Sequence, residues 1–156
     1  IKTDDNYENI TYDKTEDVWD DSVLGIITIE KIGLNATVKE GTTSDVLLEY
    51  VGHIENTATY DGNIGLAGHN RGCKNSYFAR LNELKIGDEI RYKTKFYERT
   101  YVVDNIQVIL ETDWSLLQST EENKLSLITC ITNKRKQRLC VQATEKTCNI
   151  TNTELQ

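Results

Sequence analysis

The stretch that organises this sequence is Lys124-Leu-Ser-Leu-Ile-Thr-Cys130, which is followed after a short interval by Arg138-Leu-Cys-Val-Gln-Ala143. The first run is apolar, has the length of a strand and ends at a cysteine. The second run alternates apolar and polar residues with the period of two that a half-buried strand shows. The polar, basic segment 132–137 between them predicts a loop. If the two strands pair as a hairpin, Cys130 and Arg138 lie at the same edge of the sheet, where a guanidinium group stabilises a thiolate.

A third apolar segment, Asn63-Ile-Gly-Leu-Ala-Gly-His69, also has strand length and ends at a histidine. If it runs parallel to the segment that ends at Cys130, both side chains emerge at one carboxyl-end edge of the sheet. Together with Arg138 they supply a nucleophile, a proton-transfer group and a stabiliser of an oxyanion. We therefore assign His69, Cys130 and Arg138 as the candidate catalytic residues.

Two of these assignments have a rival in the sequence. His53 is the other histidine; it follows a predicted short helix in a polar context, and no apolar strand precedes it. Arg135 lies in the predicted loop, flanked by two lysines, a setting typical of a solvated charge. The sequence therefore favours His69 over His53, and Arg138 over Arg135.

The three segments resemble the motifs of the sortase family. Leu125-Ser-Leu-Ile-Thr-Cys130 is similar to the Thr-Leu-x-Thr-Cys signature that contains the sortase cysteine, and Leu66-Ala-Gly-His69 is similar to the motif that contains the histidine. Arg138-Leu-Cys-Val-Gln is similar to the Arg-Leu-Leu-Val that follows the sortase cysteine. The motifs occur in the family's order and spacing, and the resemblance extends from about Leu24 to Glu145.

The resemblance implies an all-β fold, a closed eight-stranded sortase-type β-barrel with short crossover helices. The residue pattern points to the same class, because strand-like segments far outnumber helical ones and the two do not alternate.

The resemblance also implies a cysteine transpeptidase. In such an enzyme the Cys130 thiolate attacks a peptide carbonyl in an LPxTG-like sorting signal, Arg138 stabilises the oxyanion and His69 protonates the leaving amine. An amine from a cell-wall precursor or a pilin then resolves the thioester. We expect Ala67 and Thr129, which neighbour the catalytic residues, to line the groove that binds the signal. We expect no cofactor and no metal site, and no cluster of calcium ligands is visible in the sequence, which does not decide a calcium requirement.

Three other functions remain open. A thiol hydrolase (protease) would use the same trio with water as the acceptor. A redox or metal-binding protein would use the four cysteines, Cys73, Cys130, Cys140 and Cys148, although no Cys-x-x-Cys pattern is present. A non-catalytic adhesion barrel would contain an inert Cys130, since free cysteines are among the most buried residues. Two disulfides are possible in an extracellular protein, but the resemblance argues against one at Cys130, because it would abolish the nucleophile.

Composition narrows the function classes further. The chain has 156 residues, 38% hydrophobic and 28% charged, which suits a single globular domain. Its net charge of −7 argues against a nucleic-acid partner. No apolar run is long enough to span a membrane, and methionine is absent, which indicates a fragment of a longer precursor. Because sortases typically carry an amino-terminal anchor, we expect one upstream of Ile1 and place the domain at the extracellular face of the cell membrane.

We expect three parts along the chain: an acidic flexible linker over 1–21, the catalytic domain over 22–147 and a polar tail over 148–156. Trp19 in the linker is similar to part of the acidic-aromatic lid of some pilus-building sortases, but the lid's proline is missing, and we favour packing on the outside of the barrel. The short interval between Cys130 and Arg138, without a large helical insertion before the cysteine, resembles class C, D and E sortases more than class B. The missing lid favours class D or E, with a pilus-polymerising class C enzyme as the alternative.

The rest of the chain predicts further elements. Strands are expected over 24–32, 35–39, 88–92 and 96–110, the last with a bend or bulge at Asp104-Asn105. A cap at Thr43-Ser44-Asp45 predicts a short helix through Tyr50, and the apolar spacing predicts an amphipathic helix over 76–84. A turn or short helix is expected over 113–118, with Trp114 in the core.

Overall fold

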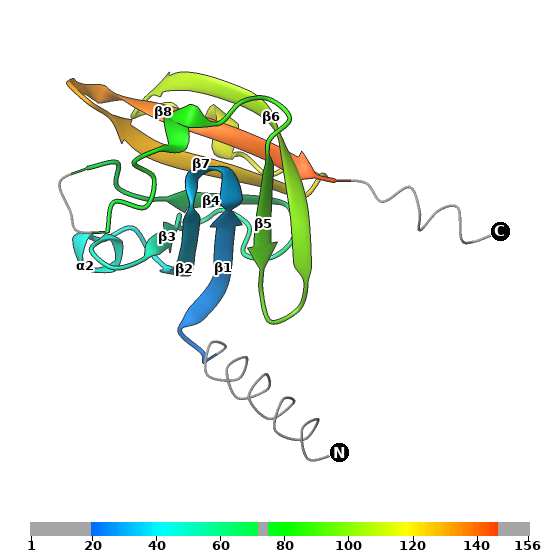
Figure 1. Ribbon diagram of the computed structural model, residues 1–156. Helices are drawn as coiled ribbons and strands as arrows, with labels where there is room; N and C mark the ends of the chain where they lie inside the picture. The colour runs from blue at the N-terminus through cyan, green and yellow to red at the C-terminus, as the bar shows by residue number, and fades with distance from the viewer. Residues whose placement is uncertain (1–19, 72–74, 147–156) are drawn as a thin grey trace, which may run out of the picture.

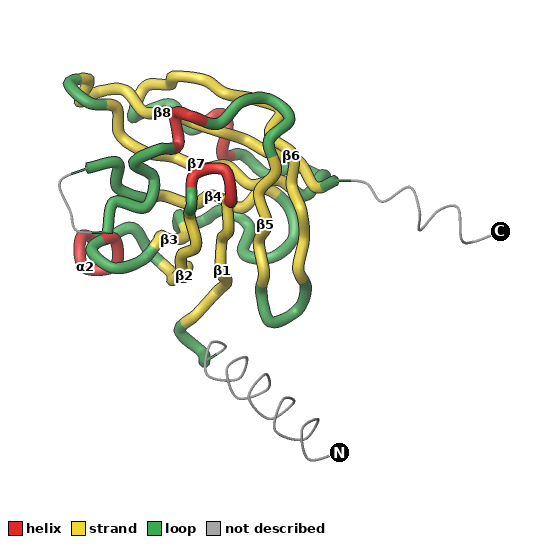
Figure 2. The backbone as a smooth tube through the Cα atoms, in the orientation of Figure 1, coloured by secondary structure: helices red, strands yellow, loops and turns green. Residues whose placement is uncertain are grey.

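In the computed structural model, which describes residues 20–71 and 75–146, eight strands close into a barrel with the neighbour order β1-β2-β3-β4-β7-β8-β6-β5 (Figures 1 and 2). This confirms the all-β, eight-stranded fold class. The strands are β1 (Val23–Ile29), β2 (Leu34–Glu40), β3 (Val51–His53), β4 (Asn63–Ala67), β5 (Glu89–Lys93), β6 (Glu98–Leu110), β7 (Lys124–Ile131) and β8 (Lys134–Glu145).

Short helical turns connect these strands. Over the described residues the only α-helix is α2 (Ser44–Leu47), and the 3₁₀ turns are η1 (Glu30–Ile32), η2 (Leu81–Glu83) and η3 (Ser115–Leu117). None of the helices among the described residues combines the length and apolar character that crossing a membrane requires.

In strands β1, β2 and β5 every second residue is buried in the barrel interior. In β1 the inward positions are Gly25, Ile27 and Ile29, and the intervening residues are only partly buried. The Tyr92 ring of β5 packs against β1 at Gly25, where a Cβ atom would lie 2.6 Å from the ring, so a side chain at position 25 would displace the tyrosine. Full burial of each aliphatic side chain stabilises the fold by about 1.5–3 kcal/mol.

Two pairings position the strand ends that carry the candidate catalytic residues. Strands β4 and β7 pair in parallel, with Ala67 opposite Ile128, which is the condition that the assignment of His69 and Cys130 to one site requires. Strands β7 and β8 form an antiparallel hairpin in which Cys130 is opposite Arg138. Continuing the parallel register by two residues brings His69 level with Cys130. All three residues therefore reach the same edge of the barrel.

The β7–β8 hairpin is tighter than the sequence predicts. Strand β7 extends to Ile131 and β8 begins at Lys134, so only Thr132 and Asn133 form the turn, and Asn133 adopts a left-handed backbone with φ of 66°. The expectation of a loop over 132–137 is wrong, and Arg135 lies on a strand. The basic side chains of this segment face solvent, which a hairpin at the barrel edge permits as readily as a loop.

The short helices also differ from the expectations. The segment 76–84 contains no α-helix; Phe78, Leu81 and Leu84 are buried at a spacing of three, which suits the 3₁₀ geometry of η2 and its flanking turns. Helix α2 has the expected cap, since the Thr43 hydroxyl accepts a hydrogen bond from the Val46 backbone N–H at 3.4 Å, but it ends at Leu47. The predicted bulge in β6 is confirmed by a register shift between Val103 and Asn105.

The expectations for the ends of the chain concern residues outside the described part. Trp19, nearly all of the linker over 1–21 and the tail over 148–156 fall there, as do Cys73 and Cys148.

Candidate active site

Cys130 is the second-last residue of β7 and is exposed. Strand alternation explains the exposure, because Thr129 before it is buried and the thiol points to the other side of the sheet. Its cross-strand partner is Arg138 on β8. The thiol is free, so it is available as a nucleophile at the barrel edge.

His69 follows β4 by two residues and is held beside Cys130 by bonds on both sides of it. The Thr129 hydroxyl donates to the Gly68 carbonyl at 2.7 Å, and the Asn70 side-chain amide donates to the Cys130 carbonyl at 2.7 Å. The Gly68 backbone N–H also donates to the Ile128 carbonyl at 3.3 Å. The segment 68–70 is therefore tied to β7 at its two ends, which places the His69 backbone beside Cys130.

The Arg138 guanidinium is oriented by three acceptors. Its Nη1 donates to the backbone carbonyls of Arg135, at 2.8 Å, and Gln137, at 2.9 Å, and its Nη2 donates to Glu111 Oε1 at 3.2 Å. The Arg138 side chain is 26% exposed and the Glu111 side chain 41% exposed, so solvent screens the ion pair and its effect is orientation more than stability.

Glu111 is a site residue that the sequence reasoning missed. It comes directly after β6, and its backbone N–H donates to the Lys136 carbonyl at 2.8 Å. Its place beside Arg138 depends on the pairing of Leu110 with Gln137 across β6 and β8. The only signal for Glu111 in the sequence is its position after the most strand-like segment. That position does not indicate which strand pairs with this segment.

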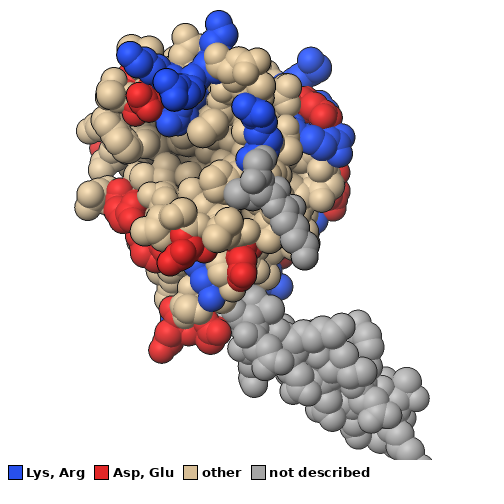
Figure 3. All heavy atoms as spheres, turned by 90° about the vertical axis from the view of Figure 1, so that its left-hand side faces the viewer, with Lys and Arg blue, Asp and Glu red and all other residues tan. Residues whose placement is uncertain are grey.

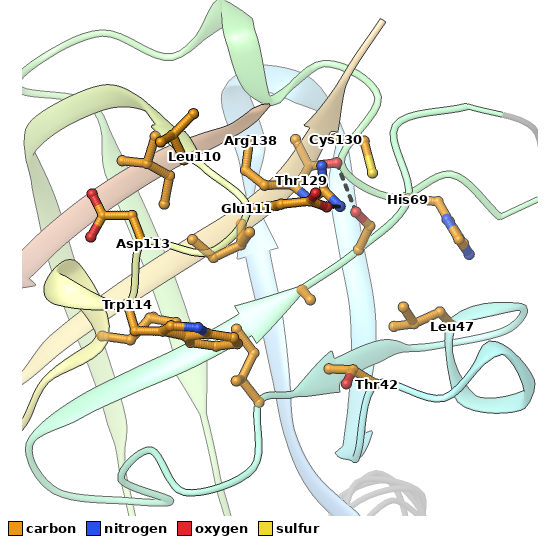
Figure 4. Close-up of a pocket in the computed structure, with 16 residues that line it drawn as sticks. Thr42, Leu47, His69, Leu110, Glu111, Asp113, Trp114, Thr129, Cys130 and Arg138 are labelled. Carbon is orange, nitrogen blue, oxygen red and sulfur yellow. Dashed lines mark hydrogen bonds and ion pairs between the residues drawn. The ribbon is translucent and has the colours of Figure 1, made fainter. Parts of the chain in front are cut away.

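Figure 4 shows the Cys130 thiol between Arg138 and His69 at the head of a cavity. Within the described part of the chain, neither the thiol nor the His69 ring makes a side-chain hydrogen bond. Catalytic contacts of this kind commonly tighten only when substrate binds. The arrangement places a nucleophile, a proton carrier and a cationic donor around one opening.

This cavity has a volume of about 350 Å³ and is mainly apolar. Below the three candidate catalytic residues, its walls come from the α2–β3 side and from the β6–β7 connection, and include Leu47, Ile54, Leu110, Trp114 and Leu117. Trp114 is 56% exposed and borders the cavity, so the expectation of a core position for it is wrong. The β6–β7 connection places the indole on the cavity wall (Figure 4).

Ala67 and Thr129 both line this cavity, next to the candidate catalytic residues. Ala67 is partly buried at the end of β4. Thr129 is only 4% exposed, and its hydroxyl is engaged by Gly68. In the structure Thr129 therefore connects β7 to the loop that carries His69.

His53 lies in a different environment from the one that the sequence suggested. It is the last residue of β3 and is 2% exposed, so the expectation that no apolar strand precedes it is wrong. Its Nδ1 lies 2.8 Å from Glu40 Oε1, and its Nε2 lies 2.8 Å from the Ala58 carbonyl oxygen. With both ring nitrogens engaged in the interior, His53 has a structural role.

The neighbouring thiol on β8 is chemically different from Cys130. Cys140 is fully buried, and burial raises the pKa of its thiol to about 12. It stays protonated near neutral pH and is a poor nucleophile. Within residues 20–71 and 75–146, no group of three or more histidine, cysteine, aspartate or glutamate residues is arranged to hold a metal ion.

Comparisons with known proteins agree on one family. The family model described as the sortase domain matches residues 27–146. Sortase A of Bacillus anthracis is 30% identical over 122 residues, which cover 78% of this chain and 58% of that protein. Sortase D of Bacillus subtilis (strain 168) is 33% identical over 109 residues, 68% of this chain and 53% of that protein. The chain thus spans little more than half the length of these curated relatives.

Solved sortase structures share the fold. Sortase C1 of Streptococcus agalactiae superposes with a TM-score of 0.75 at 26% identity, over 82% of this chain and 69% of that one. Sortase A of Corynebacterium diphtheriae superposes with a TM-score of 0.76 at 26% identity, over 81% of this chain and 61% of that one.

Proposed function

Because this chain belongs to the sortase family, we propose that it is a cysteine transpeptidase that cleaves an LPxTG-like sorting signal and joins the released carbonyl to an amine. The observation that carries the proposal is the meeting of three side chains at the head of one apolar cavity. The exposed Cys130 thiol lies across the hairpin from Arg138, and His69 is held level with it by a parallel strand.

The reaction begins with attack of the Cys130 thiolate on the scissile carbonyl carbon. The negative charge that develops on the carbonyl oxygen is stabilised by the Arg138 guanidinium, which Glu111 and two backbone carbonyls hold in orientation. The C–N bond breaks, His69 donates a proton to the leaving amine, and a thioester to Cys130 remains. The amine acceptor then attacks the thioester, its proton passes to His69, and the C–S bond breaks to release the thiolate.

The apolar cavity provides the binding surface for the signal in this proposal. Its apolar walls suit the Leu and Pro side chains of the signal, and Ala67 and Thr129 lie where the peptide approaches the thiol. Exposed Trp114 adds a flat apolar surface at the opposite wall. No step requires a metal ion or an organic cofactor.

The proposal is tested by trapping the thioester. Incubation with an LPxTG peptide in the absence of amine, followed by intact-protein mass spectrometry, is expected to add the mass of the fragment that ends at the signal's threonine. Peptide mapping is expected to place the adduct on Cys130, and Cys130→Ala is expected to form none while keeping the barrel's circular dichroism spectrum. An adduct on another cysteine, or turnover by Cys130→Ala, would overturn the assignment.

A hydrolytic thiol protease is the competing activity, because water can replace the amine in the second step. The ratio of transfer to hydrolysis, measured with rising amine concentration, separates the two. Product that remains purely hydrolytic at saturating amine would identify a protease. Transfer that rises with amine concentration would identify a transpeptidase.

Within the family, we propose a class D or E-like anchoring enzyme, supported by the similarity to Sortase D of Bacillus subtilis. The structural similarity to sortase C1 of Streptococcus agalactiae favours the pilus-polymerising alternative. A cell-wall precursor amine is the acceptor in the first case and a pilin lysine in the second, so competition between the two acceptors decides the class.

The wider architecture of the protein belongs to the same proposal. We place the catalytic domain over 22–147, between an acidic linker over 1–21 and a polar tail over 148–156. An anchor upstream of Ile1 would hold the domain at the extracellular face of the cell membrane. Fractionation of cells that express the full gene product, with protease treatment of intact cells, tests this placement.

A further inference from the structure

A second cavity, here called the basic cavity, meets the apolar cavity at the candidate catalytic residues. Its volume is about 600 Å³, and Cys130, His69 and three arginines, Arg71, Arg135 and Arg138, contribute to its walls. No aspartate or glutamate among the described residues lines it. The thiol therefore opens onto two spaces of different character, one mainly apolar and one basic.

The arginines of the basic cavity are unusual because two of them have no acidic partner among the described residues. The chain has more acidic than basic residues, 25 against 18, and Arg80, Arg91 and Arg99 each pair with a carboxylate. Arg71 and Arg135, in contrast, form no ion pair with any described residue. Figure 3 shows lysine and arginine side chains gathered at one edge of the hollowed face and acidic side chains at the opposite edge.

We propose that the basic cavity binds a carboxylate of the second substrate, so that the acceptor is the amine end of a short acidic peptide held by Arg71 and Arg135. The proposal rests on the proposed transpeptidase function and specifies the chemical class of its acceptor. A guanidinium group suits this ligand, because its planar donors match the two oxygens of a carboxylate.

The positive charge of the basic cavity has a second consequence for the attacking amine. An ammonium group near several guanidinium groups is disfavoured relative to the neutral amine, because like charges disfavour the charged form. The neutral amine is the form that attacks the thioester. A carboxylate on the same acceptor compensates the repulsion and anchors the molecule, whereas an uncharged or cationic acceptor lacks this anchor.

The attack itself is balanced without any further reactant. The amine nitrogen forms a bond to the thioester carbonyl carbon, the C–S bond breaks and its electron pair returns to Cys130 as thiolate. The proton lost by the amine goes to the neutral His69 imidazole, which gave up its proton to the first leaving amine. Arg71 and Arg135 act only on the position of the acceptor.

The test compares acceptors that differ by one negative charge. The pairs are Gly-Glu-NH₂ with Gly-Gln-NH₂, and glycylglycine with glycylglycinamide, each added to enzyme and an LPxTG peptide. The readout is the ratio of transfer product to hydrolysis product in the same reaction, so changes in thioester formation cancel. The wild-type protein is expected to prefer the acidic member of at least one pair, and the preference is expected to shrink in about 1 M salt, where the Debye length is about 3 Å.

Arg135→Ala and Arg71→Ala are each expected to lower that preference by about two- to fivefold, the range of an exposed charge pair. Lys136→Ala is the matched control, because it removes the same charge from the same strand but does not line the basic cavity. The Lys136→Ala variant is expected to prefer the acidic acceptor as strongly as the wild-type protein does. Circular dichroism melting of each variant verifies that the barrel is intact.

Three outcomes would overturn the proposal. The first is equal transfer to both members of both acceptor pairs. The second is a loss of transfer in Arg135→Ala that is equal for acidic and neutral acceptors, and the third is a loss of the acidic preference in Lys136→Ala as large as that in Arg135→Ala. The last would indicate a general effect of charge rather than a site. Mass spectrometry of the thioester in the absence of amine, run on the same samples, separates these results from failure of the transpeptidase function itself.

Discussion

Replacing Thr129 by valine should weaken both the fold and the catalytic site, because one buried hydroxyl connects them. The Thr129 hydroxyl donates to the Gly68 carbonyl at 2.7 Å, and both residues are buried. Valine has nearly the same shape but cannot donate, so the buried Gly68 carbonyl loses this partner. Leaving a buried polar group unsatisfied costs about 1–3 kcal/mol of unfolding free energy.

This loss of unfolding free energy corresponds to measurable changes in Tm and in turnover. For a chain of this size, about 1 kcal/mol corresponds to a fall of about 2–4 °C in Tm, so the valine variant should melt about 2–12 °C lower. The loop that carries His69 then keeps its ties through Asn70 and through the Gly68 backbone N–H, but loses the one through the Gly68 carbonyl. Since a misplacement of about 1 Å can lower turnover about a hundredfold, we expect kcat/KM to fall about ten- to a hundredfold.

The assay combines thermal melting, followed by circular dichroism, with turnover of a fluorogenic LPxTG peptide well below the transition. Thr129→Ser is the control, because it keeps the hydroxyl and removes only the methyl group, and it should recover most of both losses. A valine variant that melts like the wild type would show that the bond contributes nothing. A serine variant as impaired as the valine variant, or a lower Tm with full turnover, would refute the idea that the hydroxyl positions His69.

Three further predictions concern the candidate catalytic residues and their rivals. Iodoacetamide at pH 7.5, with mapping of the two tryptic peptides, should modify exposed Cys130 readily and Cys140 hardly at all, because Cys140 is buried and burial raises the pKa of its thiol to about 12, so it stays protonated at pH 7.5. Equal labelling of the two cysteines would contradict the structure. An oxyanion donor raises turnover by about a hundred- to a thousandfold, and Arg138→Lys should lose most of this rate enhancement although it keeps the charge. Full activity of the variant in a peptide-cleavage assay would remove this arginine from the mechanism. His53→Ala should lower the unfolding free energy by about 2–4 kcal/mol in chemical denaturation, because it leaves a cavity and unpaired polar groups, but the variant should still turn over substrate. His69→Ala should melt like the wild type and be inactive. The reverse pattern would exchange the roles of the two histidines.

The local pattern of the chain was sufficient to predict the two strands that end at the site. Leu125, Leu127 and the residues around them are apolar over a strand's length, and the same holds for Ile64 and Leu66 before His69. Strand endings of this kind are local properties, because they depend on which side chains bury. The resemblance of three motifs in the right order then indicated the barrel and its closure.

Other local signals were ambiguous because two structures satisfy the same pattern. A run of basic residues suits an exposed loop and an exposed strand equally well, so the sequence predicts a loop at Arg135, which lies in β8. Apolar residues at a spacing of three suit both a short α-helix and 3₁₀ turns, so the pattern predicts an α-helix over 76–84 where the structure has turns and η2. A tryptophan between polar residues gives no sign of whether it faces the core or a cavity, and Trp114 faces a cavity.

By itself, the sequence determined the strand character of the chain and which thiol and imidazole stand at the ends of apolar strands, since these follow from local burial and periodicity. Only the tertiary structure decided which long-range neighbours surround them. The Glu111 carboxylate reaches Arg138 through the register of β6 on β8, and the Thr129 hydroxyl reaches Gly68 through the parallel pairing of β4 and β7. Both contacts join residues far apart in the chain, and the physical reason they escape the sequence is that strand register is set by packing of the whole barrel rather than by neighbouring residues.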